Sequence, residues 1–82
     1  MSIHSEVFAG QDIRVAEVKN GRYFNKADLL RVTGKVPHAA SECQFLDILE
    51  ASKVVGADQE RLLDAMQRWA PHLCSQQMIE VH

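Results

Sequence analysis

The stretch Ile13–Gly34, IRVAEVKNGRYFNKADLLRVTG, contains the turn and cap signals on which the fold of this chain depends. Its first part alternates apolar and polar residues, as a half-buried strand does. Asn20 and Gly21 follow, and this pair suits the positive φ angles of a tight hairpin turn. Tyr23 and Phe24 then favour a return strand. We therefore predict a β-hairpin with one of these two aromatic side chains in the core and the other exposed, because neighbouring strand residues point to opposite faces.

The same stretch carries the signals of a short helix after the hairpin. Asn25 can cap this helix through its side-chain oxygen, and Asp28 places a carboxylate near the positive end of the helix dipole. Gly34 is a typical stop signal. Packing must stabilise so short a helix. The apolar residues that it is expected to bury are mainly Ala27 and Leu30, with Leu29 as a further candidate.

A second helix is predicted from about Ala39 to Val55. Pro37 separates it from the first helix, because the residue before a proline is driven away from helical angles. Gly56 marks its end. The pattern is typical of a helix that turns one face to the core. The apolar residues near that face are Phe45, Leu46, Ile48, Leu49 and Val55.

A third helix is predicted over residues 59–70, with Asp58 as its N-cap and Pro71 at its end. Its large apolar residues recur at helical spacing, and core packing explains them better than a ligand groove does, because a chain this small needs its large side chains inside. These residues are Leu62, Leu63, Met66 and Trp69.

The tail at 75–82, SQQMIEVH, alternates around Met78 and Val81 and is a candidate strand beside the hairpin. The sequence thus predicts an α+β fold: an N-terminal β-hairpin, three short helices and a candidate C-terminal strand. Its 82 residues, of which 46% are hydrophobic, suit a single small domain spanning 1–82.

The chain shows no secretory signal and no run of about 18 apolar residues that would cross a membrane, so we expect a cytoplasmic protein without a membrane partner. The two cysteines, Cys43 and Cys74, are too few for a disulfide framework and are expected to be free thiols in a reducing compartment. Cys43 is interpreted as a small buried residue of the second helix.

Metal binding and catalysis are not expected from the sequence. The four histidines are scattered, and the paired spacing of a zinc site is missing. No serine or cysteine has a base marked out for it nearby, and the VTGK segment at 32–35 lacks the remaining residues of a phosphate-binding loop. We therefore predict no enzymatic activity and no cofactor.

The charges are distributed unevenly along the chain. Residues 1–40 have six basic and four acidic side chains, and residues 41–82 have three basic and seven acidic ones. The halves therefore carry +2 and −4, which gives the net charge of −2. Such a basic segment can attract a polyanion. The residues expected to hold phosphates are Lys19, Arg22, Lys26, Arg31 and Lys35.

Polar residues at the start of the second predicted helix could reach the base edges of duplex DNA. Ser41 and Gln44 are the candidate base contacts, with His38 nearby. A single small domain usually gains affinity for DNA by pairing, so a homodimer is plausible. Charge alone does not separate this hypothesis from an ordinary solvated surface.

The segment FAGQDIRVAEVKNGRYFNKADLLRVTGK at 8–35 resembles the opening of the KilA-N and Bro-N group of phage and large-virus DNA-binding domains. The likeness rests on the strand Ile13–Val18, the turn at Asn20 and Gly21, and the helix that ends in Gly34. It covers about a third of the chain. The resemblance implies a phage or prophage-type protein that binds double-stranded DNA and regulates transcription.

A second likeness covers residues 23–46, YFNKADLLRVTGKVPHAASECQFL, which is similar to small phage helix-turn-helix modules of the excisionase and MerR-like type. In those modules a short helix ending in Thr-Gly leads through a turn to a second helix. The residues that carry this match are Thr33, Gly34, Gln44, Phe45 and Leu46. It also implies a DNA-binding protein of a mobile element.

The acidic second half supports a different hypothesis, in which the chain is a phage-encoded inhibitor or adaptor that binds a host protein without performing chemistry. Acidic side chains could meet a basic partner surface or imitate nucleic acid. The residues in question are Asp47, Glu50, Asp58, Glu60 and Asp64.

Overall fold

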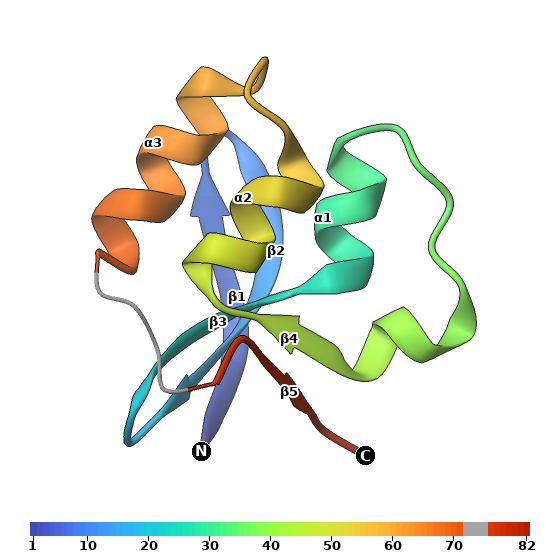
Figure 1. The fold of residues 1–82 in the computed structure, drawn as a ribbon, viewed down its shortest axis with the longest axis vertical. Coiled ribbons are helices and arrows are strands. Elements are labelled where there is room, and N and C mark those ends of the chain that lie inside the picture. Colours follow the sequence, from blue (N-terminus) through green and yellow to red (C-terminus); the bar gives the residue numbers. More distant parts are fainter. Residues whose placement is uncertain (72–75) are drawn as a thin grey trace.

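The computed structural model describes residues 1–71 and 76–82. Its elements, shown in Figure 1, are β1 (Ser2–Phe8), β2 (Gln11–Val18), β3 (Gly21–Asn25), α1 (Lys26–Val32), the 3₁₀ helix η1 (Ala39–Cys43), β4 (Gln44–Leu46), α2 (Ile48–Val55), α3 (Glu60–Trp69) and β5 (Met78–Glu80). The predicted α+β class, with an N-terminal hairpin, three helices and a later strand, is confirmed.

The five strands form one antiparallel sheet in the order β1-β2-β3-β4-β5. The strand β1 was not predicted, so the expected hairpin is the second half of a three-stranded meander. Ala9 and Gly10, with φ of 50° and 81°, form the β1–β2 turn. Among the described residues, positive φ occurs there and at two later glycines, but not at Asn20 or Gly21. The predicted hairpin therefore forms, but its turn lies one residue earlier than the Asn20–Gly21 pair and has no positive φ angle.

The turn between β2 and β3 consists of Lys19 and Asn20, because Val18 pairs with Gly21. Gly21 is already the first residue of β3. The tight turn with positive φ forms instead at the preceding hairpin, where Gly10 supplies the required freedom at its second position.

The predicted cap of α1 is confirmed. The Asn25 side chain accepts a hydrogen bond from the Asp28 backbone N–H at 3.0 Å. Gly34 follows the helix with φ of 80°. Ala27 and Leu29 are buried, as predicted for the first and considered for the second, whereas Leu30 is only half-buried and less buried than expected.

The second predicted helix is wrong for its first half. Residues 39–46 form η1 and β4, and α2 begins at Ile48. Phe45 pairs with Asn25 on one side and Ile79 on the other, so this segment fills the sheet between β3 and β5. The true N-cap of α2 is Asp47, whose side chain accepts from the Glu50 N–H at 2.9 Å.

Two further details of the helices differ from the sequence prediction. Leu49 is 43% exposed and does not join the inner face of α2, which consists of Ile48, Ala51 and Val55. The N-cap of α3 is Gln59 and not Asp58, which lies exposed before the helix. Gly56, with φ of 94°, ends α2 as predicted.

Side chains on both faces of the sheet are buried. The larger cluster joins one face to the helices and consists of Phe8, Ile13, Val15, Phe24, Leu29, Leu46, Ile48, Ala51, Val55, Leu62, Met66 and Ala70. A smaller cluster on the other face joins Ala16, Tyr23 and Phe45. Tyr23 and Phe24 are 1% and 0% exposed, so the expectation that one of them would face solvent is wrong.

Candidate nucleic-acid interface

The five basic residues predicted to hold phosphates are distributed over the molecule. Lys19 lies in the β2–β3 turn, Arg22 in β3, Lys26 and Arg31 in α1, and Lys35 in the connection after α1. In Figure 1 the β2–β3 turn and the connection after α1 lie at opposite ends of the molecule. One continuous patch does not join all five.

Arg31 belongs to a network of charges that connects β2, α1 and η1. Arg14 donates to both carboxylate oxygens of Asp28 at 3.0 Å and to the Glu42 Oε2 atom at 2.7 Å. Arg31 contacts the same two acids, with its Nη1 atom 2.9 Å from Asp28 Oδ1 and its Nη2 atom on Glu42 Oε1. Two cations and two anions thus neutralise one another, so Arg31 adds little to a field for phosphates.

Asn25 ties this network to the backbone and is itself fully buried. Its Oδ1 atom accepts from the Asp28 N–H at 3.0 Å and from Arg14 Nη2 at 3.2 Å. Its Nδ2 atom donates to the Glu42 carbonyl at 3.0 Å. One side chain therefore caps α1 and fixes η1 against it.

The environment of Asp28 favours its charged form. Burial alone would raise its pKa, since its side chain is 15% exposed, but several influences from two arginines outweigh burial. They are the hydrogen bonds from the Arg14 side chain and backbone N–H, and the positive charges of Arg14 and Arg31. The pKa of Asp28 is therefore lowered, and the same contact raises the pKa of Arg14.

We expect acid to weaken the fold through Asp28. Because its folded pKa is below the ordinary value of about 3.9, its contribution is complete above that pH and is lost as the pH falls through the folded pKa. The stability gap between the wild type and Asp28→Asn should therefore narrow below about pH 4, as measured by urea unfolding at several pH values. Asp64→Asn, in an exposed pair with Arg68, is the control and should cost less than about 1 kcal/mol throughout. A gap that stays constant down to low pH would contradict the prediction.

The two predicted base contacts are wholly or partly buried. Ser41 is fully buried, and its hydroxyl has no hydrogen-bond partner among the residues described. Gln44 lies in β4 and is half-buried, with a buried Oε1 atom that also lacks a described partner. Both were selected as part of a helix that does not form. In this fold Ser41 cannot reach a base edge.

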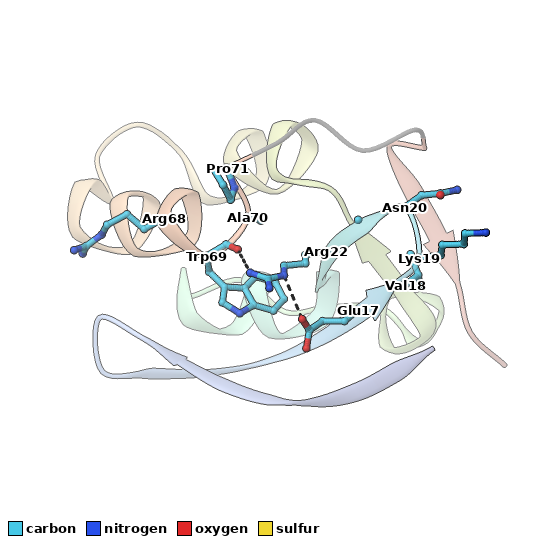
Figure 2. A pocket seen from close by; sticks show the side chains of 10 residues that line it. Glu17, Val18, Lys19, Asn20, Arg22, Arg68, Trp69, Ala70 and Pro71 are labelled. Carbon is cyan, nitrogen blue, oxygen red and sulfur yellow. Dashed lines mark hydrogen bonds and ion pairs between the residues drawn. The ribbon is translucent and has the colours of Figure 1, made fainter.

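A cleft of about 610 Å³ lies between the β2–β3 turn and the end of α3 (Figure 2). Its lining combines a hairpin and a helix that are far apart in sequence. The lining residues are Glu17, Val18, Lys19, Asn20, Gly21, Arg22, Arg68, Trp69, Ala70 and Pro71.

Arg22 lies in the middle of this cleft and is held in place there. Its Nη1 atom donates to the Trp69 carbonyl at 2.6 Å, its Nε atom lies 3.2 Å from Glu17 Oε1, and its guanidinium carbon is 5.0 Å from the centre of the Trp69 ring. The Trp69 ring packs in turn on Phe8 and Phe24, with centroids 5.6 Å and 5.3 Å apart. The hydrophobic core thus fixes the position of a surface cation.

Two more cations border the cleft. Lys19 is exposed in the β2–β3 turn, and Arg68 is 75% exposed in α3, where it pairs with Asp64 at 2.9 Å. Figure 2 shows Arg68, Arg22 and Lys19 in succession across the view, with the outer two pointing away from each other. Sequence analysis missed Arg68 because it lies in the acidic half. The sequence signal that could have identified Arg68 is its position in the last turn of α3, directly before Trp69.

The other two lysines of the predicted phosphate-binding set lie away from the cleft. Lys26 is the first residue of α1 and half-buried. Lys35 is exposed, and its Nζ atom donates to the Val54 carbonyl at 3.1 Å, which ties the connection after α1 to the end of α2. Neither lines the cleft.

The acidic residues of the alternative hypothesis do not act alike. Asp47 is buried as the cap of α2, and Glu50 pairs with Lys53 at 3.2 Å. Asp58, Glu60 and Asp64 remain exposed near or on α3. Three of the five are therefore accessible to a partner.

Candidate metal ligands do not gather in residues 1–71 and 76–82: these hold no group of three or more His, Cys, Asp or Glu side chains that could bind an ion. Cys43 is a half-buried free thiol in η1 and not part of a second helix. His72, one of the four histidines, and Cys74, which was expected to be a free thiol, lie outside the described residues. Within the same residues, no helix has the length and apolar character needed to cross a membrane.

Comparison with known proteins gave no match: no family model, curated protein or solved structure is significantly similar to this chain.

Proposed function

We propose that the protein is a small DNA-binding regulatory protein of the phage or prophage type, which holds the backbone of a duplex across the cleft between the β2–β3 turn and the end of α3. The observation that carries this proposal is the succession of Arg68, Arg22 and Lys19 along the cleft. Two of these three residues belong to the set selected from the sequence.

A row of cations suits a polymer of phosphates better than a single anion. Lys19 and Arg68 point away from each other in Figure 2, so they do not converge on one phosphate group. Phosphates repeat along a nucleic-acid strand, and cations spaced along a surface can each neutralise one of them. The net charge of −2 means that this attraction is local and acts at short range.

Arg22 has a different role from its two neighbours. Glu17 and the Trp69 carbonyl already hold its guanidinium, so it contributes less to phosphate binding than the exposed Lys19, or than Arg68, whose pair with Asp64 is exposed to solvent. It fixes the β2–β3 turn to the end of α3, and this keeps Lys19 and Arg68 at a constant separation. Asn20, exposed beside Lys19, is the side chain placed to contact a base edge.

We expect binding to a mixed-sequence duplex to weaken steeply with salt, and we expect the slope to depend on the cleft. Lys19→Ala and Arg68→Ala should each reduce the slope of log K against log salt by about 1, since each phosphate contact releases one counterion. Fluorescence anisotropy of a labelled duplex over a salt series measures this slope.

The matched control is Lys53→Ala, which removes a cation that is 63% exposed on α2, outside the cleft. Its slope should equal that of the wild type. Lys26→Ala and Lys35→Ala then show whether the duplex continues past α1, as the sequence suggested. Absence of binding at low salt, or equal slopes for all variants, would contradict the proposal.

A further inference from the structure

The strand β1 forms one edge of the sheet. It pairs with β2 along its whole length, from Ser2 with Glu17 to Phe8 with Gln11, and no strand in the described part of the chain pairs with its other side. A free edge seven residues long presents unpaired backbone N–H and C=O groups to any other strand.

Proteins usually protect such an edge from further pairing, and three of the usual devices, lysine, proline and a β-bulge, are missing from β1. Its sequence, SIHSEVF, contains no lysine and no proline. Its register with β2 advances one residue at a time without a bulge. Edges that remain monomeric commonly carry one of these features. The regular geometry of β1 therefore leaves it suited to accept another strand.

The outer surface of β1 also exposes two apolar side chains. Ile3 is 45% exposed and Val7 is 64% exposed, and they lie on the same face of the strand because their positions differ by an even number. On the opposite face His4 and Glu6 lie together, with His4 Nε2 3.0 Å from Glu6 Oε1. Each face thus carries a pair of residues placed symmetrically about Ser5.

We infer that a second copy of this chain pairs with β1 in antiparallel fashion, with Ser5 opposite Ser5 at the two-fold axis. In this register His4 lies opposite Glu6 of the second copy, and Ile3 lies opposite Val7 of the second copy. By symmetry each contact occurs twice. Two five-stranded sheets then join into one continuous sheet across the dimer.

The other registers are less favourable. A two-fold axis perpendicular to the sheet preserves its faces, and directly paired antiparallel residues share a face, so one residue of β1 must lie opposite its own copy across the axis. Centring on His4 places it opposite its own copy and sets Ile3 against Ser5. Centring on Glu6 places two carboxylates opposite each other, which is destabilising. The Ser5 register alone pairs all seven residues of β1, with His4 opposite Glu6 and the apolar side chains facing one another.

The charges allow a test that separates pairing from misfolding. His4→Glu places two carboxylates opposite each other in a dimer of this variant, and Glu6→Lys removes the acidic partner of His4. Each variant alone should dimerise at least about tenfold more weakly than the wild type. In an equimolar mixture the introduced carboxylate faces the introduced ammonium, and His4 of one chain still faces Glu6 of the other. The mixture should therefore form a heterodimer, measured by light scattering and native mass spectrometry.

A second pair of variants tests the apolar face. Val7→Lys should abolish the dimer, because it places a charge opposite the apolar Ile3 of the second copy, and a lysine on an edge strand opposes further pairing. Val36→Lys is the matched control, since Val36 is 93% exposed in the connection after α1 and should leave the dimer unchanged. All measurements are made without DNA, so their outcome does not depend on the proposed function.

Two outcomes would overturn the pairing at β1, and a third would overturn its register. One is a wild type that stays monomeric at high micromolar concentration, which would leave the edge to a strand of some other protein. The other is a dimer that survives Val7→Lys, which would place the interface elsewhere. A mixture of the two charge variants that fails to pair, although each has the circular dichroism spectrum of the wild type, would also overturn the proposed register.

Discussion

Replacing Phe24 by alanine is expected to lower the free energy of unfolding by about 3–5 kcal/mol. Phe24 is fully buried in the middle of the sheet, where it pairs with Val15 in β2 and with Leu46 in β4. Its ring also meets the rings of Phe8 at 5.6 Å and Trp69 at 5.3 Å. Alanine would leave a cavity bordered by the sheet and by α3, and the rigid sheet cannot close it.

Such a loss is large for a domain of this size, because small domains typically have about 5–15 kcal/mol of total stability. Urea unfolding followed by tryptophan fluorescence measures it directly, since Trp69 is the single tryptophan of the chain. Leu49→Ala on α2 is the control, and because Leu49 is 43% exposed it should cost about 1 kcal/mol or less. A Phe24→Ala variant within 1 kcal/mol of the wild type would show that the two ring contacts do not hold α3 to the sheet.

Replacing Asn25 by alanine is expected to cost about 2–4 kcal/mol. Loss of an N-cap costs about 1 kcal/mol, and the other two contacts of this side chain add to it. Without Asn25 the Glu42 carbonyl loses its donor, and Arg14 loses one of its acceptors. A buried polar group left without a partner costs roughly 1–3 kcal/mol.

Asn25→Ser separates the two contributions. Serine can still cap α1, but it is too short to bridge to the Glu42 carbonyl. We expect the serine variant to recover about 1 kcal/mol of the loss and no more, as measured by urea unfolding. If the serine variant were as stable as the wild type, the bridge between α1 and η1 would contribute nothing. If the alanine variant lost only about 1 kcal/mol, Asn25 would be a cap and nothing else.

The sequence predicted the features that depend on neighbouring residues. The cap at Asn25, the stop at Gly34 and the core positions of α3 are local signals, and the structure contains them. By contrast, β4 has three residues and exists because β3 and β5 lie on either side of it. No periodicity in three residues can distinguish such a strand from a helix face. The burial of both Tyr23 and Phe24 was missed for the same reason, since Phe45, which packs with Tyr23, comes from β4.

The basic cluster was predicted from charge, and charge counting takes no account of pairing. Arg31 lies between two carboxylates, and Lys35 is bonded to a backbone carbonyl. Arg68 joined the candidate site from the acidic half because folding brings the end of α3 next to the β2–β3 turn. This proximity depends on tertiary structure, so the order of charges along the chain could not predict it.

The order of strands in the sheet follows the order of strands in the chain, and this sets the entropy of assembling it. Two turns of two residues each close the first three strands, whereas pairing β3 with β4 closes a loop of residues 26–43. Closing that longer loop costs roughly 2 kcal/mol more in chain entropy than closing a two-residue turn. Forming the amino-terminal meander of β1, β2 and β3 therefore costs less chain entropy than adding β4 to the sheet.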